Sequence, residues 1–354
     1  MRANALHVRA GAVIVGMACI GASALGAVPA YQLVGQFELP TAAAFDVLPD
    51  GRALLLDGTD IKLQDSLHAS TYTTIGSIPG GLIPASPSFF SVSPDGARVA
   101  IGDNQFNAGA SVHVFDVGSF NTVGATTPDS FVVPNFDAHW SDNDTLFVSG
   151  SGATTVVTEI RADTLGVRTV IDGVGGASGG VTTDGTHLYT GNGFAFGGPS
   201  ATGEVKAFLL ADIDAAVTAI DFEASGVSVA DDLSGGSLGF DSRGNFLVGG
   251  GDFFGTSGDF GYFAVYDDEA LDVSLAGGGI MSRLDRLTFT PNNATDSYTV
   301  QFNEFTDELL VTFFDNTTFT AGTTVFRYQV PTPGAAGMLA LLGIGGLRRR
   351  ARAA

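Results

Sequence analysis

Apolar and polar positions alternate along most of the chain in short runs that reverse at tight turns. The clearest unit begins at Ala43 with AAFDVLPDGRALLLD, and a second begins at Ser88 with SFFSVSPDGARVAIGD. Each unit holds two runs with a period of two, which buries one face of a β-strand, and a Pro-Asp-Gly step between them favours a turn. Weaker copies follow as FDAHWSDNDTLFVSG, SGGVTTDGTHLYTGN, GSLGFDSRGNFLVGG and YTVQFNEFTDELLVT. The pattern therefore predicts six β-hairpins.

Each predicted hairpin is followed by a third alternating run. These runs are DIKLQD, SVHVFDV, TVVTEIRA, EVKAFLLAD, YFAVYDD and TVFRYQV, and less regular outer strands are expected in stretches such as STYTTIGSI and SRLDRLTFT. The hairpin turns centre near Asp50, Asp95, Asn143, Asp184, Arg243 and Asp307. Their average spacing of about 51 residues is close to the repeat lengths of β-propellers. The predicted fold is an all-β, six-bladed propeller, with seven blades as the alternative, and a helix is suggested only around LLADIDAAV.

The repeat resembles those of TolB-like and WD-repeat-like propellers. The stretch SPDGARVAIGD followed by SVHVFDV carries the resemblance, which is good in the first two repeats and weaker in the later ones. In such propellers the innermost strand of a blade runs into the Asp-Gly turn. The Asp and Gly residues of these turns satisfy backbone geometry, and no chemistry is assigned to them.

Charge divides the chain into three parts. All 37 Asp and Glu residues lie in residues 31–330 with ten of the 16 Lys and Arg residues, so this body carries a net charge of −27. Both ends are apolar and basic and contain no acid. A body this acidic repels phosphate groups, which excludes nucleic acid as a partner. Acidic polysaccharide would also be repelled unless divalent cations bridge it.

The first 30 residues have the layout of a secretory signal peptide. A basic stretch through Arg9 leads into the apolar run AGAVIVGMACIGASALG and then to small residues at Val28-Pro29-Ala30, after which we expect cleavage. A permanent membrane anchor is the alternative. The single cysteine, Cys19, lies inside this segment, so the mature chain would contain no disulfide, thiolate metal site or cysteine nucleophile.

The chain ends with VPTPGAAGMLALLGIGGLRRRARAA, which has three parts. A Pro-Thr-Pro step leads into an apolar run, and an arginine cluster follows. The run at residues 330–347 has 18 residues, just long enough to cross a thin bilayer as a helix, and the arginines would hold its far end on the cytoplasmic side. The body would then lie outside, in agreement with the signal peptide.

This ending resembles the PEP-CTERM sorting signal of bacterial exosortase systems, which has a Val-Pro-Glu-Pro step, an apolar segment and terminal arginines. Thr332 stands where the family usually has Glu. The residues that match the signal are Pro331, Thr332, Pro333, Gly334, Arg348, Arg349 and Arg350. The resemblance implies an exosortase-like processing enzyme, transient anchoring in the inner membrane, and transfer of the body to the cell surface or extracellular matrix. A C-terminal anchor that is never cleaved is the alternative. The predicted organisation is a signal peptide at 1–30, a propeller domain at 31–330 and a sorting signal at 331–354.

Loops at the ends of the second strands are the candidate binding face, because rigid scaffolds present function on loops. The stretches DNQFNAGA, GNGFAFGGPSATG, GGDFFGTSGDFG and FDNTTFTAG are long and rich in Gly, Asn, Asp and Phe. The candidate ligand-binding residues are Asp57, Asp103, Asn104, Asn192, Asp252, Asp259, Asp315 and Asn316. Such oxygens could hold calcium or bind the hydroxyl groups of a glycan, and an envelope protein is a further candidate partner. The interpretation that these residues simply begin turns carries more weight.

Residue patterns typical of catalysis are absent from the sequence. No His-x-His or His-Glu-x-x-His pair occurs, and His139 stands beside the single tryptophan, Trp140, in a predicted inner strand. The GASGG stretch at Ser178 begins an inner strand instead of a strand-to-helix turn, so it is not a nucleophile elbow. The leading hypothesis is a non-enzymatic binding module. The alternative is a secreted, metal-dependent hydrolase of the propeller lactonase type.

Overall fold

The computed structural model describes sixteen stretches of the chain. They are residues 31–39, 44–78, 89–102, 111–119, 122–126, 133–151, 155–174, 179–193, 203–232, 234–250, 261–282, 285–289, 297–303, 305–315, 320–321 and 324–329. The predicted signal peptide and sorting signal, and the candidate residues Asp103, Asn104, Asp252, Asp259 and Asn316, lie outside these stretches. None of the helices within them is long and apolar enough to cross a bilayer.

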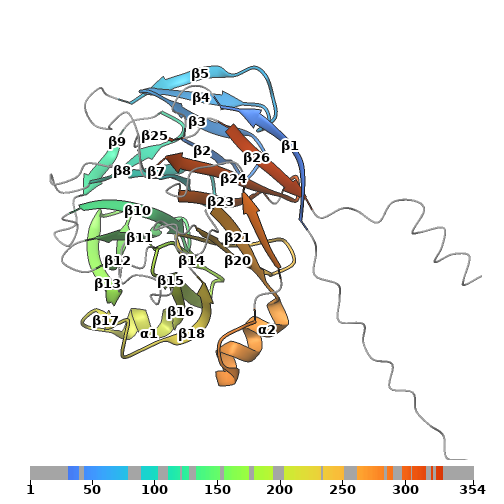
Figure 1. Ribbon diagram of the computed structural model, residues 1–354. Coiled ribbons are helices and arrows are strands. Elements are labelled where there is room, and N and C mark those ends of the chain that lie inside the picture. Colours follow the sequence, from blue (N-terminus) through green and yellow to red (C-terminus); the bar gives the residue numbers. More distant parts are fainter. Residues whose placement is uncertain are drawn as a thin grey trace, which may run out of the picture.

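Six sheets follow one another around a central axis (Figure 1), and we number them as blades one to six in chain order. From the axis outward, blade one holds β2 (Ala44–Val47), β3 (Ala53–Asp57), β4 (Asp60–Gln64) and β5 (Thr73–Ser77). Blade two holds β6 (Phe90–Val92), β7 (Arg98–Gly102), β8 (Val112–Asp116) and β9 (Thr122–Thr126). Blade three holds β10 (Val133–Trp140), β11 (Thr145–Ser151), β12 (Thr155–Arg161) and β13 (Gly166–Val174). Blade four holds β14 (Val181–Thr183), β15 (His187–Gly191), β16 (Gly203–Leu209) and β18 (Val227–Asp232). Blade five holds β19 (Ser237–Phe240), β20 (Phe246–Gly250), β21 (Gly261–Tyr266) and β22 (Asp285–Phe289). Blade six holds β23 (Ser297–Asn303), β24 (Glu308–Asp315), β26 (Thr324–Gln329) and β1 (Gln32–Glu38). The prediction of a six-bladed propeller is confirmed.

Blade six combines the two ends of the body. Its three inner strands come from the end of the chain, and its outermost strand, β1, comes from the beginning. The pairing of β1 with β26 runs from Gln32 opposite Gln329 to Glu38 opposite Thr324. Tyr31, just before β1, is 2% exposed and donates a hydrogen bond from its hydroxyl to Asp241 of blade five at 2.8 Å. The first and last strands therefore close the ring of blades.

The hairpin turns use the backbone conformations that the sequence suggests. Gly51 and Gly96 have φ values of 84° and 69°, in the left-handed region that glycine adopts without strain. In blade two, Asp95 accepts hydrogen bonds from the Ser93 hydroxyl at 2.7 Å and from the Ala97 amide at 3.0 Å, which holds the reversal. In blade six, Asp307 occupies the turn with φ at 53°. The weakest repeat thus keeps the same kind of turn without glycine.

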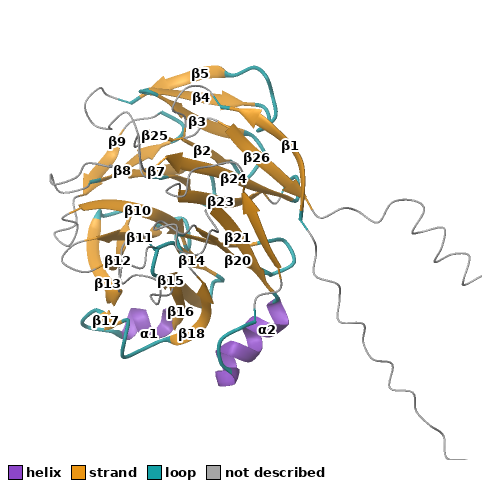
Figure 2. Ribbon diagram, in the orientation of Figure 1, coloured by secondary structure: helices purple, strands orange, loops and turns teal. Residues whose placement is uncertain are grey.

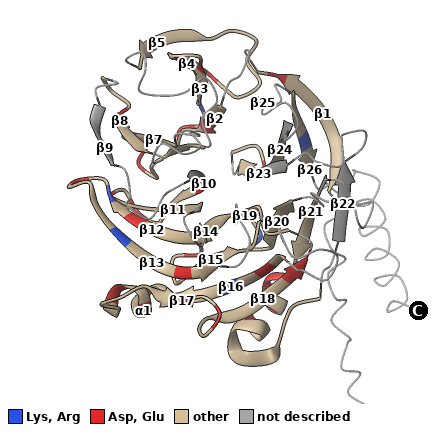
Figure 3. Ribbon diagram, turned by 60° about the vertical axis from the view of Figure 1, so that its left-hand side comes forward, with Lys and Arg blue, Asp and Glu red and all other residues tan. Residues whose placement is uncertain are grey.

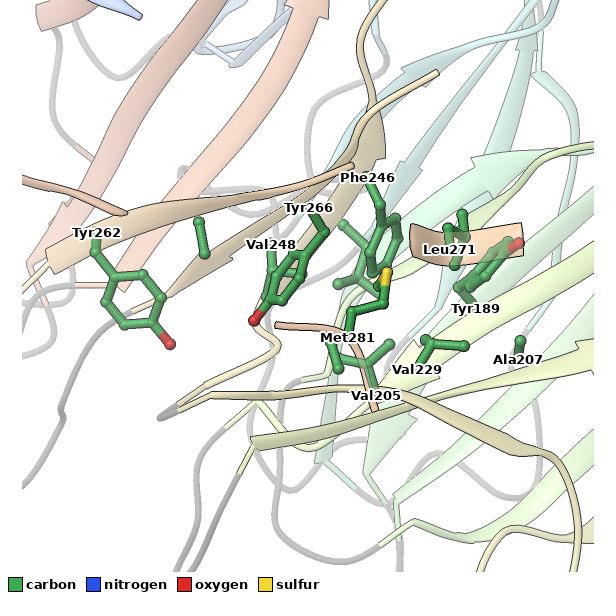
Figure 4. Packing of buried hydrophobic residues seen from close by; sticks show 13 residues of the cluster. Tyr189, Val205, Ala207, Val229, Phe246, Val248, Tyr262, Tyr266, Leu271 and Met281 are labelled. Carbon is green, nitrogen blue, oxygen red and sulfur yellow. The ribbon is translucent and has the colours of Figure 1, made fainter. Parts of the chain in front are cut away.

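Most of the hydrophobic core lies between neighbouring blades. At the junction of blades four and five, the rings of Tyr189 and Phe246 are 5.2 Å apart and the rings of Phe246 and Tyr266 are 6.3 Å apart (Figure 4). Aromatic pairs of this kind contribute about 0.5–1.5 kcal/mol beyond their buried area. Met281 fills the remaining space beside them. Alternation therefore buries both faces of a sheet, one against each neighbour.

Two connections reach back to the outer strand of the preceding blade (Figure 2). Between β16 and β18 lie α1 (Leu210–Ala215) and β17 (Ile220–Asp221), and β17 pairs in parallel with β13 of blade three. Between β21 and β22 lie α2 (Asp268–Val273) and η1 (Ser274–Gly278), after which the Met281 amide donates to the Val229 carbonyl of β18 at 2.9 Å. The first helix was expected from the sequence and the second was not. Both connections cover sheet edges that would otherwise present backbone groups for pairing.

Candidate functional site

The six innermost strands surround the axis, and each is the edge of its sheet. In β2, the Asp46 carboxylate accepts a hydrogen bond at Oδ2 from the amide of Val92 in blade two, at 2.7 Å. Its Oδ1 accepts from the amide of Val47, also at 2.7 Å, and from the side-chain amide of Gln301 in blade six. One carboxylate thus joins three consecutive blades around the axis.

Blade three repeats this arrangement with a second carboxylate. Asp137, in β10, accepts at Oδ2 from the amide of Val181 in blade four at 3.0 Å, and at Oδ1 from the amide of Ala138 at 2.9 Å. An edge strand carries amide and carbonyl groups that its own sheet leaves without partners. The two aspartates supply acceptors for such amides on the next blade.

The other three junctions between inner strands are also joined by hydrogen bonds. The Trp140 indole donates to the carbonyl of Ser91 in blade two at 3.1 Å. The Ser237 hydroxyl of blade five accepts from the Val300 amide at 3.1 Å and donates to the carbonyl of the same residue at 3.2 Å. Between blades four and five, the Gly180 amide donates to the Gly235 carbonyl at 2.7 Å. Hydrogen bonds therefore join all six inner strands around the axis. We call this set of hydrogen bonds the axial ring.

Burial shifts the pKa values of the acidic and basic groups in the axial ring. It raises the pKa of Asp46 to about 6 and that of Asp137 to about 7, although the amide hydrogen bonds work in the opposite direction. It lowers the pKa of His139, in the same strand as Asp137, to about 4, so this imidazole is neutral at pH 7. Carboxyl groups that titrate near pH 7 are suited to proton transfer. Here, however, both oxygens of each carboxylate already accept amide hydrogens.

A second polar cluster connects blades one and six. The Glu308 carboxylate is 1% exposed, and its Oε1 accepts from the Arg327 guanidinium while its Oε2 lies 2.7 Å from Nε2 of His68. The His68 ring meets the ring of Phe37 in β1 edge to face at 5.3 Å. Burial opposes ionisation of Glu308, but the hydrogen bonds from Arg327 and His68 outweigh it and lower the pKa of the carboxyl group. This closure cluster is an electrostatic contact across the junction where the ring of blades closes.

Asp57 and Asn192 are the candidate rim residues whose side chains are described. Asp57, at the end of β3, forms an ion pair with Lys62. Asn192 follows β15, and its backbone accepts from the Gly235 amide at 2.7 Å and donates to the Glu204 carbonyl at 3.1 Å. The two lie on blades one and four, so the structure does not bring them together. Asp315 ends β24, opposite Thr320, and a ligand role for the rim stays a prediction.

In the part of the chain that the structure describes, no three His, Cys, Asp or Glu side chains gather closely enough to hold a metal ion. The sequence analysis missed the axial aspartates and the closure cluster. A signal for the first was present, since Asp46 and Asp137 each directly follow a phenylalanine within an inner strand. No local signal marks the pairing of His68 with Glu308, which are 240 positions apart.

No family model and no curated protein matches the chain. Among solved structures, XC5397 from Xanthomonas campestris, described as a gluconolactonase important in glucose secondary metabolic pathways, is similar with 13% identity and a TM-score of 0.49 over 83% of this chain and 88% of that one. A chain of the mitotic checkpoint complex is similar with 8% identity and a TM-score of 0.50 over 94% of this chain and 99% of that one. The second similarity extends to the fold alone, and nothing about activity follows from the first.

Proposed function

We propose that the protein is an exported, six-bladed propeller that acts as a binding module at the cell surface or in the extracellular matrix. The observation that carries the proposal is the axial ring, in which the carboxylates of Asp46 and Asp137 accept hydrogen bonds from amides of neighbouring blades. The axis then serves as a scaffold. The loops at the strand ends remain as the surface for recognition.

The proposed export and sorting of the protein rest on the sequences of its two ends. The signal-peptide layout of residues 1–30 supports export, and the Pro-Thr-Pro step, apolar run and arginine cluster of residues 331–354 support processing by an exosortase-like enzyme. A net charge of −27 in the body keeps such a module soluble and away from anionic polymers. Neutral glycans and envelope proteins are the partners that this charge permits, and calcium is the cation that the rim oxygens favour.

Export and sorting are tested by mass analysis of the protein recovered from the outside of its native cells. We expect a new N-terminus at Tyr31 and a C-terminus between Pro331 and Gly334. Recovery of the full-length chain in the cytoplasm would refute export. An exported chain with all its arginines would refute processing and leave a permanently anchored propeller.

The binding role is tested on the same purified protein with a glycan array, with and without calcium. The variants Asp103→Asn and Asp252→Asn change rim loops, and Asp163→Asn, in the turn after β12, is an exposed control at the other ends of the strands. Loss of glycan or calcium binding in the rim variants alone supports the proposal. Equal binding by all three variants contradicts a role for the rim.

A metal-dependent hydrolase of the lactonase type is the second candidate. The observation in its favour is that the pKa values of Asp46 and Asp137 lie at about 6 and about 7, where a carboxyl group can act as general acid or base. Metal analysis of the purified protein and an assay of lactone hydrolysis decide this question. A bound metal with turnover that Asp103→Asn or Asp252→Asn abolishes supports the enzyme. Absence of both metal and turnover eliminates it.

A further inference from the structure

Both ends of the body leave the propeller at one place. Strand β26 ends at Gln329, and Gln329 pairs with Gln32 at the start of β1. Tyr31, immediately before β1, is held by Asp241, so this end of the strand is fixed to blade five. The apolar segments that precede residue 31 and follow residue 329 therefore start next to each other.

The tether between the body and the predicted membrane span is very short. The apolar run begins at residue 330, directly after β26, so at most its Val-Pro-Thr-Pro step at residues 330–333 lies between the strand and the bilayer. Four residues reach at most about 14 Å when fully extended. While the sorting segment lies in the bilayer, the Gln32 end of β1 must lie within about that distance of its surface.

The chemistry of this edge suits an apolar boundary. Leu33 and Val34, directly after Gln32, are 55% and 48% exposed. They lie on an outermost strand whose outer edge pairs with no other strand in the described part of the chain, whereas β13 pairs with β17 and β18 receives the Met281 amide. The exposed apolar side chains of Leu33 and Val34 therefore lie at the end of β1 where the tether begins.

Charge also favours this edge over the rest of the body. Together β1 and β26 carry one acid, Glu38 at the far end of β1, and one base, Arg327 (Figure 3). The body as a whole carries 37 acids and ten bases. An anionic bilayer surface attracts basic segments and repels acidic ones, so most other faces of the propeller are held away from it.

We propose that β1 is the membrane-facing edge of the protein before its tail is removed, with Leu33 and Val34 at the boundary between lipid headgroups and acyl chains. Because β1 is the outermost strand of blade six, this contact orients the propeller with its axis parallel to the membrane. Both rims of loops then open sideways, where a ligand can reach them. The inference rests on the proposed function, which places the C-terminal segment in a membrane.

The experiment uses the chain from Tyr31 onward with an uncut tail, which contains no cysteine, reconstituted into phosphatidylcholine nanodiscs that hold one protein each. A single cysteine is introduced by Val34→Cys or, as a matched control, by Val167→Cys, which is 40% exposed on the outer strand of blade three. Each cysteine carries the same fluorophore, and nitroxide-labelled lipid is the quencher. We expect the label at position 34 to lose fluorescence and the label at position 167 to keep it. Adding Leu33→Glu to the Val34→Cys protein should restore the fluorescence.

The outcomes separate this inference from the proposed function. Equal quenching at both positions, or none at either, in discs that contain the protein overturns the membrane-facing edge and leaves the proposed function standing. Failure of the chain to enter discs at all overturns both. The measurement is repeated in larger discs that hold two copies. Quenching at position 34 in these discs alone would assign this edge to a second copy, which also overturns the proposal.

Discussion

Substitution of Glu308 by glutamine tests whether the closure cluster holds the ring of blades together. The carboxylate is 1% exposed and accepts from Arg327 at one oxygen and from His68 at the other. The glutamine side chain keeps one acceptor oxygen, which can serve Arg327 or His68, and places its NH₂ group against the other of these two donors. The change therefore removes the buried charge and one hydrogen bond at the junction of blades one and six.

The magnitude follows from the burial of the three side chains. Removing one partner of a buried ion pair costs about 3–5 kcal/mol. The side chains of Arg327 and His68 are 27% and 29% exposed, so water compensates them in part. We expect a loss of about 2–3 kcal/mol in the free energy of unfolding at pH 7.

The pH dependence of this loss is the sharper test. Hydrogen bonds hold the pKa of Glu308 below its ordinary value of 4.5, so its contribution is complete above that pH and disappears as the pH falls through the lowered pKa. In urea unfolding the difference between wild type and Glu308→Gln should be larger at pH 7 than at pH 3.5, because the contribution declines once the pH falls below 4.5. The control is Glu38→Gln at an exposed position, expected within about 0.5 kcal/mol of wild type. Equal losses at both pH values would refute the electrostatic explanation.

Three further predictions concern the scaffold. Burial raises the pKa of Asp137 to about 7, so the wild type should lose about 2–3 kcal/mol of stability relative to Asp137→Asn as the pH rises from 5 to 8. Urea midpoints of the two proteins that shift in parallel would contradict this. In Gly203→Ala the new Cβ would lie 2.5 Å from backbone of the segment between β18 and β19, which should cost about 2–3 kcal/mol in thermal unfolding, whereas Gly239→Ala has open space and should be nearly neutral. Tyr31→Phe removes the hydrogen bond to Asp241 and should lower stability by about 1.5 kcal/mol; an unchanged melting temperature would show that the hydroxyl contributes nothing.

The blades were predictable because their signal is local. Alternation at period two and the Asp-Gly turns mark β2, β3, β6 and β7 within a few residues of each other, and the third strands follow at short distances. The second helix, α2, also had a readable start, since Asp267 caps it and acidic residues follow in its first turn. That signal was overlooked because the surrounding stretch is rich in Asp.

Features that join distant parts of the chain could not be predicted in the same way. The role of β1 in blade six depends on a pairing between Gln32 and Gln329, for which neither sequence stretch carries a mark. The axial aspartates are similar, because their partners are backbone amides of another blade and any residue can supply an amide. The sequence shows that Asp46 is the polar residue of an apolar strand, and the fold is needed to identify its hydrogen-bond partners on the neighbouring blades.

The closure of blade six by the first strand also sets an order of events in time. Strand β1 emerges first from a ribosome or an export channel, yet its partner β26 emerges last, about 300 residues later. Bringing such distant segments together costs about 5 kcal/mol of chain entropy, more than any hairpin within a blade. Until then Tyr31, Leu39 and the apolar inner face of β26 have no cover, and a protease or a chaperone that recognises extended apolar segments would find them. The last residues of the body thus decide how long the first ones stay exposed.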